Sequence, residues 1–456
     1  MTETPGELIL IRHGRATPRQ GTELDAQREL TKRGREELEK ILPELSAHLN
    51  SASQFQLGTS PLPRAFQTAE IIGRYLGTDK IEQFDWIAQG EYTGLQERLK
   101  NLKPSSSLVI VGHEPHLGRW SRQFSGFTVP FKKAMAVGFR VTSLEPLRAW
   151  PAWMITPETA GLRDMDIEGG QPVLCAFQKI LRFKLRGIFQ MLQKFLDHPE
   201  DPETAHQLRV SIRAFRSLLS FIRPKLDQMQ YQHVQLQTKK LSQRLGHLRE
   251  IDILKWEWLK LRKTYPELTR KKSALLAVLE TERQREQAEI CGGAEMMLSA
   301  VFDIWNWLNG DLAAEAEEAK GQKQKQGQTF EDFSRKRIGS GIKKTAAYLK
   351  TADYTDFSNI HGLRIQFKKL RYVLKELDPL LHLKSKGSIK SFEALQDLFG
   401  SYCDAERNLA LLNELNGRYA DPAFCFESGI LWGHQTFTAG EKLEKIKNFD
   451  GRILPA

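Results

Sequence analysis

The stretch LILIRHGRA, residues 8–16, runs four apolar residues directly into arginine, histidine and glycine. Consecutive apolar residues followed by polar ones are typical of a buried parallel strand, and α/β proteins bind ligands at the carboxyl ends of such strands. The stretch therefore predicts that Arg12, His13 and Arg15 lie at the edge of a sheet. Taken alone, an Arg-His-Gly tripeptide is a weak signal, which chance or a surface turn explains more readily than a ligand site.

The first 155 or so residues alternate short apolar runs with amphipathic ones, as strands joined by crossover helices do. The apolar runs are LILI, FQLGTS, SLVIVGH at 107–113 and AMAVGFRV near 134, with a helix expected from about Arg64. This alternation predicts an α/β domain with a mostly parallel sheet over residues 1–156. Proline, glycine and acidic residues dominate the next segment, so residues 157–172 are expected to form a linker.

The length of 456 residues predicts two or three domains. Four cysteines are scattered without CxxC spacing, which argues against a disulfide framework or a zinc site. No apolar run approaches the ~18 residues of a membrane span. We therefore expect a cytoplasmic, soluble protein with no membrane partner.

The net charge of +11 is distributed unevenly along the chain. Residues 1–170 contain 21 Lys+Arg and 21 Asp+Glu, which leaves 46 and 35 for the remainder. All the excess positive charge follows residue 170, which predicts a large anionic partner there. From residue 173 to about 450 the sequence has helical periodicity and predicts an all-α helical-bundle domain. The polar stretch GQKQKQGQ at 321–328 is expected to be a solvated loop.

An internal repeat divides this helical region into two similar halves, about 173–320 and 329–450. HQLRVSIRAFRSLL at 206–219 aligns without a gap to HGLRIQFKKLRYVL at 361–374, and the related segments LSQRLGHLREID and LQDLFGSYCDAE follow at 241 and 395. At about 100° per residue, each copy is a helix with one apolar and one basic face. The basic residues are His206, Arg209, Arg213 and Arg216 in the first copy and His361, Arg364, Lys368 and Arg371 in the second.

Two basic stripes of this kind suit a linear polymer of phosphates. They contain no interleaved aromatic residues on which bases would stack and few amides to read base edges, so nucleic acid is a less suitable partner. A solvated cationic face is the alternative interpretation. Further basic residues at helical spacing extend the stripes: Arg182, Arg186, Arg337 and Lys344. The tryptophans are expected to belong to the apolar core rather than to a ligand platform: Trp256, Trp258, Trp305 and Trp307.

Two more segments accompany the Arg-His-Gly tripeptide. SPLPRAFQTAE at 60–70 places Arg64 at the start of a helix, and VGHEPHLG at 111–118 places His113 after a strand. With RELTKRG at 28–34, these motifs resemble the histidine phosphatase superfamily, and the short length of the region resembles its SixA-type phosphohistidine phosphatases. The resemblance covers about the first 155 residues. It implies His13 as the nucleophile and Arg12, Arg64 and His113 as the phosphate pocket.

The chemistry of phosphoryl transfer supports these roles, because it needs an in-line nucleophile and positive groups on the phosphoryl oxygens. Neighbouring positive charge favours the neutral ring of His13, while a protonated His113 would add a charge-assisted hydrogen bond. No metal or other cofactor is expected. Glu91 is the one candidate for the general acid that the sequence suggests. The alternative is that it is a surface carboxylate without a catalytic role. A weak acid favours substrates whose leaving group departs easily, namely phosphohistidine or a phosphoanhydride.

The repeat itself, with LGHLREID behind its first copy, resembles CHAD domains, which are helical, built from two similar halves and associated with inorganic polyphosphate. The resemblance covers about residues 173–450 and departs where the second half has FGSYCDAE. Together, the two regions predict a phosphatase tethered to a polyphosphate-binding module. Its expected partners are inorganic polyphosphate, in the cytoplasm or on polyphosphate granules, and a phosphohistidine-bearing protein. A non-catalytic polyphosphate scaffold and a nonspecific RNA binder stay open as alternatives.

Overall fold

A computed structural model describes the following residues: 6–18, 25–49, 54–103, 106–160, 167–266, 272–321, 328–383 and 385–449. The chain divides into two compact units, residues 1–165 with 295–302 and residues 166–294 with 303–456. Most of the expected polar loop, 322–327, and part of the expected linker, 161–166, lie outside the described residues.

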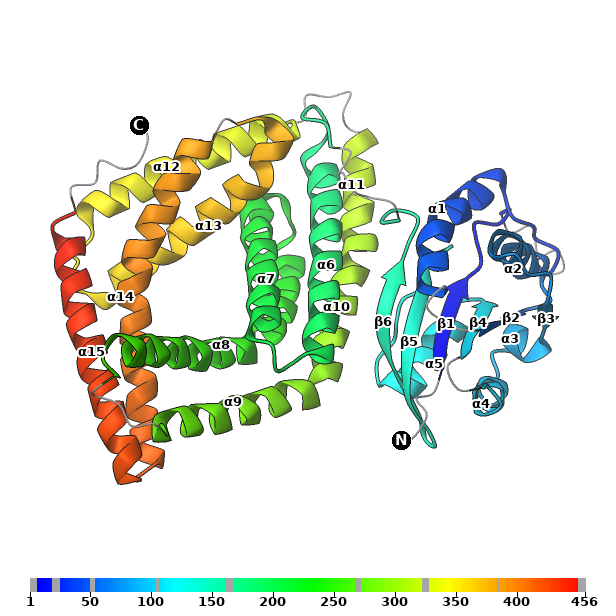
Figure 1. The fold of residues 1–456 in the computed structure, drawn as a ribbon. Coiled ribbons are helices and arrows are strands. Elements are labelled where there is room, and N and C mark those ends of the chain that lie inside the picture. The colour runs from blue at the N-terminus through cyan, green and yellow to red at the C-terminus, as the bar shows by residue number, and fades with distance from the viewer. Residues whose placement is uncertain are drawn as a thin grey trace. The chain divides into compact units, whose positions relative to one another are not determined.

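The first unit is a six-stranded sheet with helices packed against it (Figure 1). Its elements are β1 (Glu7–Arg12), α1 (Lys32–Leu49), β2 (Gln54–Thr59), α2 (Pro63–Leu76), β3 (Ile81–Gln83), α3 (Asp85–Gln89), α4 (Tyr92–Lys100), β4 (Ser106–Gly112), α5 (His116–Ser125), β5 (Ala136–Leu144) and β6 (Leu147–Ile155). The strand order is β3-β2-β4-β1-β5-β6, with β1 to β4 parallel and β5 and β6 antiparallel. The predicted α/β class with a mostly parallel sheet is confirmed, although the sequence analysis does not predict β3 or β6.

The sheet places β1 between β4 and β5, so segments far apart in sequence end at one edge. Arg12 pairs in register with Gly112, and the backbone N–H of His13 donates to the Gly112 carbonyl at 3.1 Å. Strand β2 lies on the other side of β4. The residues that follow these three neighbouring strands, including Arg64 and His113, therefore start from the same edge of the sheet.

Helix α1 fits closely against the loop that follows β1, which explains the glycine of the RELTKRG motif. A Cβ atom on Gly34 would lie 2.1 Å from the carbonyl oxygen of Arg15 and 2.9 Å from its backbone nitrogen. No side chain fits at that separation. One turn further along the same face of α1, Leu38 is fully buried in the core between helix and sheet.

The second unit is helical apart from one isolated β-bridge between Pro172 and Thr329, within the part of the chain that the structure describes. Its elements are α6 (Val173–Asp197), α7 (Pro202–Ile222), η1 (Arg223–Lys225), α8 (Gln228–Thr264), α9 (Ala274–Gly292), α10 (Ala294–Asn309, of which residues 295–302 are assigned to the first unit), α11 (Asp311–Gly321), α12 (Phe330–Thr351), α13 (Phe357–Leu381), α14 (Lys386–Arg418) and α15 (Pro422–Lys447). The predicted all-α class is confirmed. None of the described helices has the length and apolarity that a bilayer-spanning helix needs.

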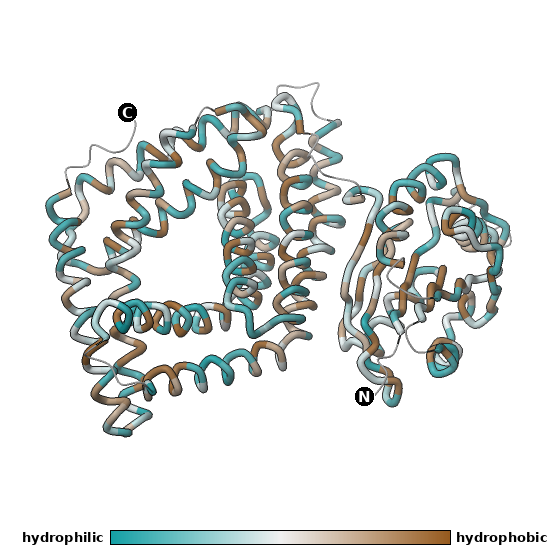
Figure 2. The backbone as a smooth tube through the Cα atoms, in the orientation of Figure 1, coloured by the Kyte–Doolittle hydropathy of each residue, from teal (hydrophilic) through white to brown (hydrophobic). Residues whose placement is uncertain are grey.

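The two repeat copies form α7 and α13, which pack against each other and, respectively, against α8 and α14. Figure 1 shows these four helices framing the middle of the unit, and in Figure 2 hydrophobic and hydrophilic residues alternate along them. Most of the predicted apolar residues are buried: Leu208, Ile212, Phe215, Leu218 and Leu219 on α7, and Leu363, Phe367, Val373 and Leu374 on α13. Leu370 is only half-buried.

Aligned glycines give the two halves the same local packing. A Cβ on Gly246 would lie 3.2 Å from Nη1 of Arg209, and a Cβ on Gly400 would lie 3.5 Å from Nε of Arg364. In each half, the first arginine of the repeat therefore lies against a glycine of the following long helix. The segments around 241 and 395 resemble each other because both receive this side chain.

We predict that Gly34→Ala destabilises the first unit by about 1–3 kcal/mol, because the added methyl group overlaps the Arg15 backbone and α1 must shift. Differential scanning calorimetry of the full chain would measure the change. Gly187→Ala, on α6, is the control: its Cβ would meet no atom within 4 Å. It should leave stability unchanged or raise it by about 0.5–1 kcal/mol. Equal stability of both variants would contradict the close packing of α1.

Candidate functional site

His13 lies immediately after β1 and is 6% exposed. Its Nδ1 lies 2.7 Å from the Gly14 carbonyl oxygen. Because a carbonyl only accepts, Nδ1 must carry the proton, and Nε2 is left with its lone pair. Burial is the main cause that lowers the pKa of His13 to about 3; the Gly14 bond opposes this, and Arg64, Arg12 and Lys133 add to it. The ring is therefore neutral near pH 7, as a nucleophile must be.

His113 faces His13 from the end of β4, with ring centroids 5.0 Å apart. It is 6% exposed, and neither of its ring nitrogens has a hydrogen-bond partner among the described residues. Burial, followed by His13 and Arg64, lowers its pKa to about 3. His113 is thus neutral in the free protein, and the protonated form considered above requires a bound anion to raise its pKa.

The two arginines are held in place by main-chain carbonyls. Nη1 of Arg12 donates to the Phe131 carbonyl at 2.8 Å, and Nη1 of Arg64 donates to the Asp25 carbonyl at 2.7 Å. The carboxylate of Asp25 also lies 3.6 Å from Nη2 of Arg64. Arg64 is buried near the start of α2, and Arg12 is half-buried. Both guanidinium groups are therefore fixed before a substrate binds.

Sequence reasoning missed two charged residues near this site. Glu114 accepts hydrogen bonds from the Phe131 N–H at 2.9 Å and the Gly118 N–H at 3.3 Å, so it fixes the loop whose carbonyl holds Arg12. Its position inside the VGHEPHLG motif was the available signal. Lys133 acts on the pKa of His13 from the segment before β5, where no pattern marks it.

Glu91 is exposed and directly precedes α4. Its neighbour Gly90 contacts the ring of His116, where an added Cβ would come within 2.1 Å of Nδ1. The Gly90 carbonyl also accepts a hydrogen bond from Nε1 of Trp120 at 3.1 Å. Glu91 thus begins its helix beside the loop that follows His113, and its role as general acid stays a prediction.

In the second unit, a cavity of about 480 Å³ lies between α7, α8, α13 and α14. We call it the first basic cavity. Its basic lining residues are His206, Arg209, Arg213, Arg249, Arg364, Lys368, Arg371, Lys375 and Arg407. Three carboxylates share the wall: Glu250, Asp397 and Asp404. The lining thus holds eight Lys and Arg side chains against three carboxylates, which suits an anionic ligand.

A second cavity adjoins the first and a third adjoins the second, and each adjoining pair shares wall residues. The second basic cavity, about 300 Å³, shares Arg213, Arg364, Lys368 and Arg407 with the first and adds Arg216, His361 and Lys369. The third, about 630 Å³, shares Lys369 with the second and adds Lys225, Lys336, Arg337 and Lys344. The described lining of the second and third includes no carboxylate. The three together are called the basic channel below.

Cations in the channel lie buried beside other cations, which disfavours their charged forms. Burial, and then Arg364 and Arg213, lower the pKa of Lys368 to about 7. Burial and Arg213 likewise lower the pKa of Arg209 to about 10. Some anionic partners exist, since Arg364 Nη2 lies 2.7 Å from an oxygen of Asp404. The lowered pKa values nevertheless indicate that positive charge in this cavity is incompletely compensated.

Ten of the twelve residues predicted for anion binding line the basic channel: His206, Arg209, Arg213, Arg216, Arg337, Lys344, His361, Arg364, Lys368 and Arg371. Arg182 and Arg186, on α6, line none of its three cavities. Six basic lining residues were missed: Arg249, Arg407, Lys225, Lys336, Lys369 and Lys375. Arg249 belongs to LGHLREID and Arg407 directly follows FGSYCDAE, so the related segments behind the repeat carried the signal.

In the described parts of the chain, no group of three or more His, Cys, Asp or Glu residues is placed to hold a metal ion. The expectation of a core position holds for Trp258, Trp305 and Trp307, which are at most 4% exposed. It is wrong for Trp256, which is 58% exposed. Trp256 and Trp258 are two residues apart on α8, and side chains at that spacing point to opposite sides of a helix.

Comparison with known proteins gives three proteins that are similar to one region or the other. An uncharacterized protein of Picosynechococcus sp. is 32% identical over 145 residues, which cover 29% of this chain and 84% of that protein. The structure of the protein histidine phosphatase SixA complexed with tungstate covers 33% of this chain and 97% of its own, with 21% identity and a TM-score of 0.29. The crystal structure of the CHAD domain from the plant Ricinus communis covers 63% of this chain and 91% of its own, with 23% identity and a TM-score of 0.45.

Two family models match the chain in separate regions. The histidine phosphatase superfamily (branch 1) matches residues 8–113, and the CHAD domain matches residues 184–413. The second match spans half of the chain. This chain therefore belongs to the CHAD domain family and carries, ahead of its CHAD domain, a region of the histidine phosphatase superfamily.

Proposed function

We propose that the first unit is a metal-independent phosphatase with His13 as its nucleophile. The observation that carries this proposal is the pair of buried, neutral imidazoles beside two fixed arginines, with both ring nitrogens of His113 unpaired among the described residues. Buried polar atoms without partners are costly and rare in proteins. The oxygens of a phosphoryl group would supply the missing partners.

In the proposed reaction, Nε2 of His13 attacks phosphorus and the bond to the leaving group breaks, which gives a phosphohistidine intermediate. Arg12 and Arg64 offer charge-assisted hydrogen bonds to the phosphoryl oxygens, and His113 becomes protonated as negative charge arrives. Water then attacks phosphorus and releases inorganic phosphate. Glu91 is the proposed proton donor to the leaving group. Because Glu91 is exposed, we expect it to give the leaving group little assistance. The proposed substrate is therefore one whose leaving group departs easily, either phosphohistidine or the end of a phosphoanhydride chain.

We propose that the basic channel of the second unit binds inorganic polyphosphate. Its cavities are contiguous, its cations come from both repeat copies, and its second and third parts lack carboxylates in their described lining. A linear polyanion would offset the burial and the neighbouring charges that lower the pKa of Lys368. Such a protein would work in the cytoplasm or on polyphosphate granules, where its ligand and a phosphohistidine-bearing protein are available.

We predict that His13→Ala abolishes phosphate release and that His113→Ala lowers its rate by about 10²–10⁴-fold, the usual effect of removing one group that stabilises the transition state. The assay compares a phosphohistidine protein, polyphosphate and an aryl phosphate as substrates. The control is His198→Ala, a substitution of an exposed histidine in the second unit. Near-normal turnover by His13→Ala would refute the nucleophile assignment, and inhibition by EDTA would reveal a metal requirement.

We predict that the fourfold variant Arg209→Ala, Arg213→Ala, Arg364→Ala, Arg371→Ala binds long-chain polyphosphate more weakly and with a flatter salt dependence. Each contact to a linear polyanion that is lost should reduce the log–log slope by roughly 0.7–0.9, by analogy with nucleic acids. The matched control is Arg182→Ala, Arg186→Ala, which removes arginines that do not line the channel. Unchanged binding by the fourfold variant, or equal affinity of the parent for RNA, would overturn the polyphosphate assignment.

We predict that polyphosphate affinity falls as the pH rises from 7 to 9. The pKa of Lys368 is about 7 in the free protein, and a bound anion must raise it. Below pH 7 the amine of Lys368 is already charged. Above pH 7 the protein must take up a proton when it binds the ligand, so the affinity falls by up to about tenfold per pH unit. Lys368→Arg should remove this fall, since arginine stays charged throughout. An unchanged pH profile in that variant would show that Lys368 does not contact the ligand.

A further inference from the structure

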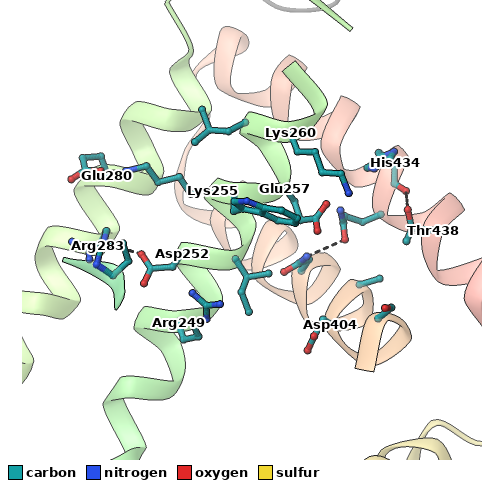
Figure 3. A pocket seen from close by; sticks show the side chains of 18 of the residues that line it. Arg249, Asp252, Lys255, Glu257, Lys260, Glu280, Arg283, Asp404, His434 and Thr438 are labelled. Atoms are coloured by element: carbon teal, nitrogen blue, oxygen red, sulfur yellow. Dashed lines mark hydrogen bonds and ion pairs between the residues drawn. The ribbon is translucent and has the colours of Figure 1, made fainter. Parts of the chain in front are cut away.

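A cavity of about 1040 Å³ in the second unit lies outside the basic channel, between α8, α9, α14 and α15 (Figure 3). We call it the Trp256 cavity. It shares wall residues, among them Arg249 and Asn408, with the first basic cavity, so the two cavities are adjacent. Its charge is mixed, because Glu257 and Glu280 line it together with lysines (Figure 3). A bare phosphate chain therefore gains less here than in the channel.

One wall of this cavity presents an aromatic surface. Trp256 is 58% exposed, although tryptophan is usually well buried. The ammonium group of Lys260 lies 5.1 Å from the centre of its ring. An exposed indole in the wall of a cavity is a stacking platform for a planar ring, and such stacking tolerates any base because every base has a π face.

Another wall holds a buried ion pair with unused hydrogen-bonding capacity. The side chains of Asp252 and Arg283 are each 5% exposed, and Nε of Arg283 donates to Oδ1 of Asp252 at 2.8 Å. Oδ2 of Asp252 and Nη2 of Arg283 have no hydrogen-bond partner among the described residues. Both residues line the cavity. The two unpartnered atoms are themselves inaccessible, so a ligand in the cavity reaches them only after the side chains turn toward it, and it would then relieve the cost of leaving them without partners.

A heteroaromatic base has the complementary features, a flat π face and an edge with adjacent donor and acceptor atoms. We propose that the Trp256 cavity binds the base of a nucleoside polyphosphate, with its phosphate tail passing Arg249 into the first basic cavity. The tail placement rests on the proposed polyphosphate binding, whereas the base placement rests on Trp256, Asp252 and Arg283 alone. The ligand class is a nucleotide with three or more phosphates.

The test is isothermal titration of the full chain, in the His13→Ala background so that hydrolysis does not interfere, with ATP, GTP and inorganic tripolyphosphate. At least one nucleotide should bind more tightly than tripolyphosphate, by about fivefold to a hundredfold, which is the usual gain from stacking one base. Trp256→Leu should remove this advantage and leave tripolyphosphate binding unchanged. Trp432→Leu is the control, since Trp432 is 42% exposed on α15 and does not line the cavity.

Equal affinity for tripolyphosphate and both nucleotides would overturn the inference, as would equal losses for all three ligands in Trp256→Leu or the same effect in Trp432→Leu. If RNA binds more tightly than either nucleotide and this binding depends on Trp256, the nucleotide proposal would be replaced by recognition of an RNA end. The two proposals fail separately. If the protein prefers a nucleotide in a Trp256-dependent way but does not bind polyphosphate, only the channel assignment is refuted. If it binds polyphosphate tightly but shows no such preference, only the base site is refuted.

Discussion

Positive and potentially positive groups are buried beside one another in both units, and the rest of the structure must accommodate the repulsion between them. Removing a charge from water is costly unless an opposite charge compensates it. The two units meet this constraint differently. Near pH 7 the histidines of the first unit lose their protons, which leaves Nε2 of His13 able to attack. The arginines of the second unit cannot lose theirs, so that unit keeps a positive interior that a ligand must neutralise.

Such interiors persist because apolar packing behind them stabilises the fold. Most apolar residues of α7 and α13 are buried on the faces away from the channel, although Leu219, Leu370 and Val373 also line it. The strands that precede His13 and His113 have fully buried apolar interiors. Backbone contacts then set the positions of the charged groups. The Arg15 backbone lies against Gly34, and the carbonyls of Phe131 and Asp25 hold the two arginines. Substitutions that alter this support would impair the sites without touching a ligand.

Periodicity and local motifs were enough to predict both fold classes and most channel residues, because an apolar stripe fixes which face of a helix is buried. They could not assign Arg182 and Arg186, since the period of α6 does not say which neighbour its basic residues face. Glu114 and Lys133 reach their site through tertiary contacts from segments without a repeating pattern. Trp256 was misjudged because composition suggests a core tryptophan, while its spacing from Trp258 already places the two rings on opposite sides of α8.

The duplicated arrangement of α7 and α13 has a consequence for how a ligand can be oriented. Peptides and nucleic acids have distinct ends, so a site that reads them must also have a direction. A chain of phosphates has the same sequence from either end, and two similar halves offer it similar contacts whichever end enters first. The matched pairs Arg209 with Gly246 and Arg364 with Gly400 are the structural basis of this equivalence. For the proposed ligand, the channel would recognise spacing and charge without polarity, so the polymer could thread in both directions.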